Sequence, residues 1–179
     1  MKIRSVIAAV SVVLCASSAA VVSAQTPVTK ATVPGIANFS KVETTVACAG
    51  ATSPAALADV KKMGFNSVIN LRMAGEAGFE LEAEAAAAKA AGINYFHLPF
   101  NNAAPDPAVV DSFLKVITDK ANEPAFIHCA SANRAAMMWM VKRIAVDKWD
   151  VAKATEEATA LGLTSPALRA FAIEQAQKH

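Results

Sequence analysis

Cys129 and Arg134, with four residues between them, are the side chains of this sequence best suited to chemistry. An apolar run over residues 124–128 predicts a buried strand that ends just before Cys129, and a helix is expected to begin near Arg134. A short loop that leads into a helix directs backbone N–H groups inward, and the helix dipole adds positive potential. This field stabilises both a thiolate and a bound anion, and an arginine can hold two oxygens of a phosphate or sulfate. The segment therefore predicts an anion-binding loop with a nucleophilic cysteine.

Two further side chains are expected near this loop. His128 directly precedes Cys129 and is expected to stabilise its thiolate. Arg72 follows another predicted strand, where it could bind a substrate anion or pair with Glu76, and the salt bridge is the favoured alternative. A buried cysteine that ends a core strand is the alternative for Cys129 itself, but the neighbouring histidine and arginine favour a reactive thiol.

Apolar runs of strand length alternate with helical segments along the chain. The sequence predicts strands over residues 67–71, 93–98 and 124–128, and helices over residues 54–62, 80–91, 107–120, from about 134, 150–160 and 165–177. Strands separated by helices form a mostly parallel central sheet flanked by helices, so a three-layer α/β fold is expected. Ligands bind beyond the carboxyl ends of such strands, which points to the segments after Leu71, Leu98 and His128.

The beginning of the chain has the pattern of an export signal. A short positive region precedes an apolar run over residues 6–14, and small residues then lead to Ala24. This pattern predicts a signal peptide over residues 1–24, a flexible tail over 25–36 and one domain over 37–179. The apolar run is too short to span a bilayer well, so a retained anchor is the less favoured alternative. We therefore expect a periplasmic or secreted protein that is free of the membrane after cleavage.

Composition excludes several classes of partner. The formal net charge is +2, and removal of Lys2 and Arg4 with the signal peptide takes it to 0, so neither a nucleic acid nor a membrane surface is expected as a partner. The spacing of His, Cys, Asp and Glu predicts no metal site, and no cofactor is expected. Cleavage would leave Cys48 and Cys129, which could form a disulfide or act as resolving and reactive thiols. An inert Cys48 on a strand is the favoured alternative.

The segment over residues 128–134 resembles the signature loop of the cysteine-based protein tyrosine phosphatase superfamily, dual-specificity type. It is most similar to the phosphatase-like domain that bacteria fuse to β-lactamase-like hydrolases. Other segments resemble the family in the same order along the chain. Residues 38–42 and 48–53 resemble its first strand and the small-residue turn. Residues 68–72 resemble its V-I-N-L-R strand, and residues 95–100 resemble its Y-x-H-x-P-V strand. The resemblance covers about residues 36–145, and it implies a dual-specificity-phosphatase-like sheet.

This resemblance implies roles for the residues of the loop. Cys129 would attack phosphorus and form a phosphocysteine, and Arg134 would clamp the phosphoryl oxygens together with backbone amides. The candidate substrate-binding residues are His128, Ala130, Ser131, Ala132, Asn133 and Arg72. In the family, an aspartate after the Y-x-H-x-P strand protonates the leaving group before water hydrolyses the intermediate.

The same comparison reveals departures from the family pattern. Four residues separate Cys129 from Arg134, whereas the larger phosphatase family has five. Ala132 replaces a glycine, so a positive φ would be strained, and Ala135 replaces the usual Ser or Thr. Asn101 and Asn102 occupy the region of the aspartate, which makes Asp106 the nearest candidate acid, although a helix N-cap is its favoured alternative role. The next carboxylate, Asp111, is expected on a helix.

The leading hypothesis is an exported cysteine-dependent phosphatase that hydrolyses phosphomonoesters, such as phosphotyrosine, in a phosphorylated small molecule or a phosphoprotein. A rhodanese-like sulfurtransferase is an alternative, because rhodanese loops can have this length, but the rhodanese G-H-I-type stretch is missing. A non-catalytic phosphate-binding module is a further alternative, favoured by Ala132 and by the uncertain acid. The oligomeric state is left open.

Overall fold

The computed structural model describes residues 28–179, and the predicted signal peptide lies outside the described residues. Within this range the strands are β1 (Thr29–Lys30), β2 (Ser40–Val42), β3 (Val46–Ala49), β4 (Ser67–Asn70), β5 (Asn94–His97) and β6 (Ala125–His128). The α-helices are α1 (Leu57–Lys62), α2 (Leu81–Ala91), α3 (Pro107–Ile117), α4 (Asn133–Ala145), α5 (Val151–Leu161) and α6 (Pro166–Ala176). The 3-10 helices are η1 (Pro54–Ala56) and η2 (Lys120–Asn122).

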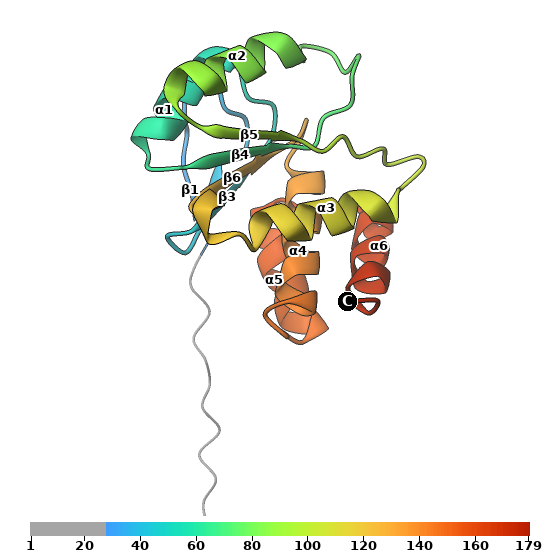
Figure 1. Cartoon of the computed structure of the whole chain (residues 1–179). Helices are drawn as coiled ribbons and strands as arrows, with labels where there is room; N and C mark the ends of the chain where they lie inside the picture. Colours follow the sequence, from blue (N-terminus) through green and yellow to red (C-terminus); the bar gives the residue numbers. More distant parts are fainter. Residues whose placement is uncertain (1–27) are drawn as a thin grey trace, which may run out of the picture.

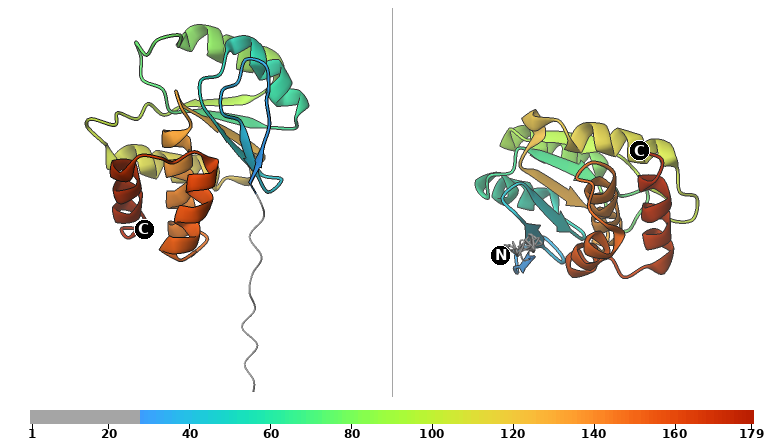
Figure 2. Two further views of the ribbon diagram at one scale, coloured as in Figure 1. Left: turned by 180° about the vertical axis from the view of Figure 1, so that it is seen from behind. Right: turned by 90° about the horizontal axis from the view of Figure 1, so that it is seen from below.

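These strands form one sheet in the order β1-β2-β3-β6-β4-β5. The pairs β3–β6, β6–β4 and β4–β5 are parallel, whereas β1–β2 and β2–β3 are antiparallel. Helices α1 and α2 cover one face of the sheet, and α3, α4, α5 and α6 cover the other (Figures 1 and 2). The three-layer, mostly parallel α/β fold expected from the sequence is therefore confirmed.

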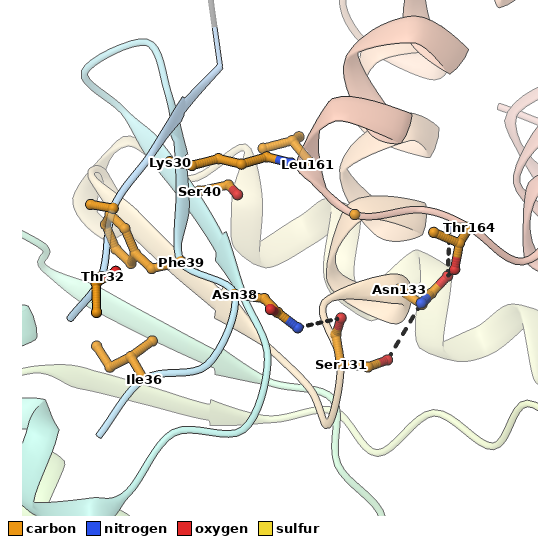
Figure 3. A pocket seen from close by; sticks show the side chains of 12 residues that line it. Lys30, Thr32, Ile36, Asn38, Phe39, Ser40, Ser131, Asn133, Leu161 and Thr164 are labelled. Carbon is orange, nitrogen blue, oxygen red and sulfur yellow. Dashed lines mark hydrogen bonds between the residues drawn. The ribbon is translucent and has the colours of Figure 1, made fainter. Parts of the chain in front are cut away.

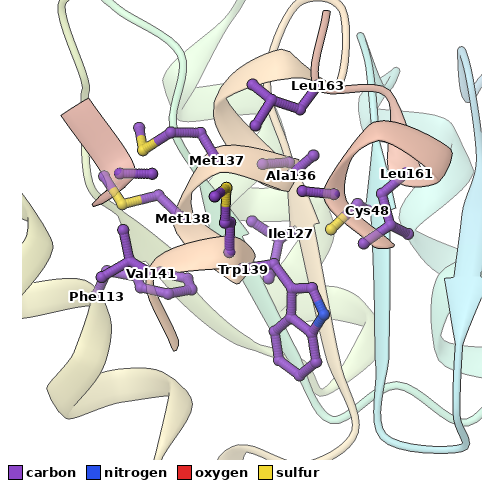
Figure 4. Close-up of a cluster of buried hydrophobic side chains, with 14 of the residues drawn as sticks. Cys48, Phe113, Ile127, Ala136, Met137, Met138, Trp139, Val141, Leu161 and Leu163 are labelled. Atoms are coloured by element: carbon purple, nitrogen blue, oxygen red, sulfur yellow. The ribbon is translucent and has the colours of Figure 1, made fainter. Parts of the chain in front are cut away.

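The alternation of side chains along the strands divides the core in two. Ile127 and Cys129 point toward the layer of α3–α6, and Phe126 points toward the layer of α1 and α2. The central strands β4 and β6 are buried on both faces, which explains their nearly continuous apolar sequences. Helix α4 is also buried along most of its length, and its methionines pack with side chains of α3 and the sheet (Figure 4).

The predicted helices and strands agree with the structure to within a few residues, and the main differences lie before residue 50. The tail expected over residues 25–36 is not a tail from Val28 onward, because β1 pairs with β2, and Val33 and Ile36 form an isolated bridge. Short polar segments such as Thr29–Lys30 carry no periodic signal, so their pairing depends on the neighbouring strand. The predicted caps Asp106 and Ser165 accept backbone N–H groups, whereas Ser53 makes no side-chain cap bond.

A cluster of charges joins the far end of α4 to α5 and to the β2–β3 turn. Arg143 donates to Glu157 (2.7 Å), to Glu43 (2.6 Å) and to Asp147 (2.9 Å). Burial alone would lower the pKa of Arg143, but these hydrogen-bonded carboxylates raise it well above its ordinary value. The guanidinium also packs over the ring of Trp149. These contacts hold the far end of α4 against α5 and the β2–β3 turn. No helix within residues 28–179 is long and apolar enough to cross a membrane.

Candidate active site

The loop between β6 and α4 lies at the carboxyl edge of the sheet. Cys129 directly follows β6, and α4 begins at Asn133, one residue before the predicted start. The Cys129 N–H donates to the carbonyl of Ala49 (3.2 Å), and the Ala51 N–H donates to the carbonyl of Ala130 (3.0 Å). A carbonyl and the next N–H point in opposite directions across a trans peptide, so the amide after Ala130 faces away from β3. The predicted strand–loop–helix arrangement is present.

Arg134, in the first turn of α4, is held by three groups from other parts of the chain. Its Nη1 donates to the carbonyls of Leu71 (2.9 Å) and Phe100 (3.1 Å) and to Oε1 of Glu76 (2.6 Å), and its Nη2 donates to Oε2 of Glu76 (2.8 Å). A guanidinium has five N–H donors in a fixed fork. These contacts leave the Nε–H and one Nη2–H for a ligand, which suits two oxygens of a phosphate.

Cys129 lies close enough to Arg134 to affect the ionisation of the guanidinium. Burial alone would lower the pKa of Arg134, but its hydrogen bond to the Glu76 carboxylate and the neighbouring Cys129 raise that pKa above its ordinary value. Cys129 is fully buried at the base of the loop. The structure therefore brings together the two residues that the sequence singled out.

Glu76 is a site residue that the sequence analysis connected only with Arg72. Its carboxylate binds Arg134, accepts from Nε of Arg72 (3.2 Å) and accepts the backbone N–H of Met73 (2.9 Å). Burial raises the pKa of Glu76, but the hydrogen bonds from Arg134 and Met73 outweigh it and lower the pKa to about 2. Glu76 is therefore ionised at neutral pH. Its partner Arg134 lies 58 residues away, so no local spacing could have predicted the contact.

Arg72 does not face a ligand. Its guanidinium donates to Glu76 and to the carbonyls of Ala77 (2.7 Å) and Gly78 (3.2 Å), and its side chain is 3% exposed. The salt bridge that the sequence analysis favoured is confirmed, and the role of Arg72 as a direct substrate-binding residue is wrong. Its contacts instead give the loop between β4 and α2 a fixed shape around Glu76.

The expectation that His128 stabilises the Cys129 thiolate is also wrong. Successive residues of a strand point to opposite faces, so the ring of His128 lies beside Phe126 on the side of α1 and α2, whereas Cys129 faces α4. His128 Nε2 lies 2.6 Å from Oε1 of Glu84, and both side chains are buried.

A short polar network surrounds this pair. Asn70 donates from Nδ2 to Oε2 of Glu84 (3.1 Å) and contacts the hydroxyl of Tyr95 (2.9 Å). Burial and the nearby Glu84 charge raise the pKa of Tyr95 above its ordinary value. The network joins β4, β5, β6 and α2 directly beneath the loop, so its role is to support the sheet at this edge.

Asp106 lies on the loop between β5 and α3, where its side chain caps the helix. Oδ1 accepts the N–H of Ala108 (2.9 Å), and the residue is exposed. The favoured N-cap role is confirmed, and the assignment as general acid stays a prediction. The same loop begins at the site, because the carbonyl of Phe100 accepts from Arg134. Asp111 lies on α3 and pairs with His179 (3.2 Å).

Cys48 and Cys129 are both free thiols. Cys48 lies within the apolar cluster under α4 and α5, near Leu161 (Figure 4). Burial raises the pKa of Cys48 well above its ordinary value, and the neighbouring Cys129 and Glu157 add to this effect. These surroundings favour the inert role for Cys48. Among residues 28–179, no group of three or more His, Cys, Asp or Glu side chains is arranged to hold a metal ion.

Residues 38–146, more than half of the chain, match the model of the phosphatase-like domain of beta-lactamase hydrolase-like proteins. The chain belongs to this family. With its fold, this membership places the protein in the cysteine-based tyrosine-phosphatase-like superfamily, and its enzyme class is that of phosphoric monoester hydrolases. A search of the curated proteins finds no match to the chain.

Solved structures show the same fold at low sequence identity. TpbA of P. aeruginosa is 21% identical, with 84% of this chain and 89% of TpbA covered and a TM-score of 0.62. The core catalytic domain of the PP-IP phosphatase SIW14 from S. cerevisiae is 15% identical, with 79% and 87% covered and a TM-score of 0.64. A DUF442 protein from Shewanella putrefaciens is 18% identical, with 81% and 92% covered and a TM-score of 0.68.

Ala132 marks where this member of the family departs from its loop pattern. The residue has φ 75° and ψ −14°, in the left-handed region that the missing glycine would adopt freely, so the predicted strain is present. This conformation costs an L-residue about 1–2 kcal/mol. The alanine methyl is buried, and a Cβ at Gly162 would lie 3.1 Å from it. The turn after α5 therefore needs glycine at position 162 to pass over Ala132.

We expect Glu76→Gln to reduce the pH dependence of the unfolding free energy. The pKa of Glu76 falls from 4.5 to about 2 on folding, so its contribution is fully present above pH 4.5 and is lost as the pH falls toward 2. After allowance for solvent screening, about 1 kcal/mol of the unfolding free energy should depend on it. Urea unfolding at pH 7 and pH 3 should therefore show a smaller difference for the variant than for the wild type.

The exposed Glu82→Gln serves as the control, since Glu82 lies on the outer surface of α2. If Glu76→Gln and Glu82→Gln show the same dependence on pH as the wild type, the ion pair with Arg134 does not stabilise the fold.

Proposed function

We propose that this protein hydrolyses phosphomonoesters through a phosphocysteine intermediate, with Cys129 as the nucleophile. One observation carries the proposal: Glu76 and two carbonyls orient Arg134 beside Cys129, and these contacts leave its Nε–H and one Nη2–H unused. A planar cation next to a thiol, at a loop that leads into a helix, suits a tetrahedral dianion under nucleophilic attack. Family membership supports the same chemistry.

The reaction has two displacement steps at phosphorus. The Cys129 thiolate attacks, a sulfur–phosphorus bond forms, and the bond from phosphorus to the ester oxygen breaks. The departing oxygen takes a proton and leaves as an alcohol or phenol. Water then attacks the phosphocysteine, which releases inorganic phosphate and restores the thiolate. Arg134 and loop amides stabilise the charge on the equatorial oxygens in both steps.

Substrates belong to the class of phosphorylated small molecules or phosphoproteins. A cysteine-to-serine variant of P. aeruginosa TpbA has been crystallised in complex with phosphotyrosine, and SIW14 is a PP-IP phosphatase. These proteins share the fold and differ in their ligands. The fold therefore supports the phosphate-binding chemistry, and the residues around the loop select the leaving group.

Purified protein should release phosphate from 4-nitrophenyl phosphate or a phosphotyrosine peptide. Cys129→Ser should lower kcat by more than about a thousandfold, because the covalent route is closed. Cys48→Ser is the matched control, since it replaces the other free thiol of the described residues. Equal inactivity of wild type and Cys129→Ser would contradict the proposal.

Two further measurements identify the alternative in that case. Transfer of sulfur from thiosulfate to cyanide would indicate a sulfurtransferase. Vanadate binding without turnover would indicate a phosphate-binding module.

We further propose that Asp106 protonates the leaving group. It is the carboxylate of the loop that begins at Phe100 beside Arg134. Asp106→Asn should lower kcat for phenyl phosphate by about a hundredfold, because phenolate leaves poorly without a proton. It should have much less effect on 4-nitrophenyl phosphate, whose anion leaves readily. Asparagine also caps helices well, so the variant preserves the start of α3.

Asp111→Asn provides the control for charge on the same helix. If Asp106→Asn lowers kcat for both substrates to the same extent, or for neither, Asp106 is not the acid.

We also propose that the protein is exported, on the basis of the signal pattern before Gln25. Cells that make the full chain should hold it outside the cytoplasm, and mass spectrometry of that protein should show Gln25 as its first residue. A cytoplasmic protein that retains Met1 or Lys2 would contradict the signal peptide.

A further inference from the structure

A cavity of about 630 Å³ lies beside the catalytic loop, a size typical of small-molecule sites. Ser131 and Asn133 of the loop form one part of its wall, and Thr164 follows them from the turn between α5 and α6. Asn38 and Lys30 contribute the opposite side, from the segment around β1 and β2 (Figure 3). The cavity therefore shares two residues with the loop that would hold the reacting phosphate.

Two side-chain amide groups of this wall direct hydrogen-bond donors at its edge. The Oδ1 of Asn133 accepts the N–H groups of Thr164 (2.8 Å) and Ser165 (3.0 Å), which directs its Nδ2 toward Ser131 Oγ at 3.4 Å. The Nδ2 of Asn38 makes another long contact, 3.4 Å to the carbonyl of Ser131. Both amide groups lie in Figure 3 at the edge of the cavity. Contacts of this length are weak, so a ligand oxygen would compete for these donors.

The electrostatics of the cavity favour an anion. Among the described lining residues, Lys30 is the only one with a charged side chain, and none is a carboxylate. Pairing of Lys30 with Ser40 across β1 and β2 fixes its backbone, and its side chain extends toward Leu161 (Figure 3). Helices α4 and α6 both begin next to the cavity, at Asn133 and after Ser165, and their dipoles add positive potential there.

An aromatic leaving group finds little to stack on in this wall. Among the described lining residues only Phe39 is aromatic, and it is 6% exposed. The wall therefore offers donors and a cation rather than a ring face, which distinguishes an anionic leaving group from a phenyl ring.

We propose that this cavity binds a second anionic group of the substrate, so that the preferred substrate is a small molecule with two phosphates. The inference rests on the proposed phosphatase function and specifies its substrate class. One phosphate would lie against the amides of the loop, and the other would lie against Lys30 and the amide groups of Asn38 and Asn133. Because Ser131 and Asn133 belong to both sites, a single small molecule can span them.

The test compares a pair of substrates that differ by one phosphate. We expect the wild type to have a higher kcat/KM for fructose 1,6-bisphosphate than for fructose 6-phosphate. Lys30→Ala should lower the ratio of these two values about fivefold, since an ion pair of the exposed Lys30 with the second phosphate is lost, and Lys30→Glu should lower it further. Lys41→Ala is the matched control, because Lys41 is on the adjacent strand and its Nζ lies over the ring of Phe65, on the other face of the sheet. Its ratio should equal that of the wild type.

Calorimetry with Cys129→Ser separates this inference from the proposed function. This variant should bind the bisphosphate more tightly than the monophosphate, and addition of Lys30→Ala should abolish most of the difference. If no phosphate ester is hydrolysed but this difference remains, the anion site in the cavity is supported, whereas the phosphatase proposal and the substrate assignment that rests on it fail. If esters are hydrolysed but Lys30→Ala changes neither the ratio nor the binding, the cavity proposal is overturned. It is also overturned if the bisphosphate only activates hydrolysis of 4-nitrophenyl phosphate and is not itself hydrolysed.

Discussion

The bidentate ion pair between Arg134 and Glu76 is the interaction on which the site depends. A guanidinium in the first turn of a helix would otherwise sample several directions, and its fork recognises phosphate only in one of them. Glu76 binds one edge of the Arg134 guanidinium, and the carbonyls of Leu71 and Phe100 fix the plane of that group. The Nε–H and one Nη2–H on the remaining edge are thereby left for a ligand. Because the carboxylate is ionised far below neutral pH, this orientation is insensitive to pH in the physiological range.

The rest of the fold forms a rigid frame around this pair and its short loop. Leu71 follows β4 and Phe100 follows β5, so both carbonyls lie at the edge of the sheet where parallel strands end. Helix α4 is buried along most of its length, and Arg143 near its far end is bound to α5 and to the β2–β3 turn. The left-handed residue Ala132 is covered by the turn at Gly162. Its strain is tolerated because these elements over-determine the path of the backbone.

The sequence by itself determined the fold class, the family resemblance and the strand–loop–helix that carries Cys129 and Arg134. These conclusions depend on local periodicity, caps and spacing within seven consecutive residues, which the chain encodes directly. The sequence also predicted strain at Ala132 in a left-handed conformation, since it shows alanine where the family pattern has glycine. The short strand β1 was missed because Thr29 and Lys30 have no pattern of their own.

Only the tertiary structure decided which side chains serve the site. Residue 128 points to the face opposite residue 129, so His128 supports the sheet instead of the thiol. Arg72 is used within its own loop, and Glu76 joins Arg134 from 58 residues away. The cavity beside the loop combines β1, β2, α4 and the α5–α6 turn. Contacts of this kind arise from the packing of distant segments. Residue spacing along the chain does not predict which distant group a side chain will contact.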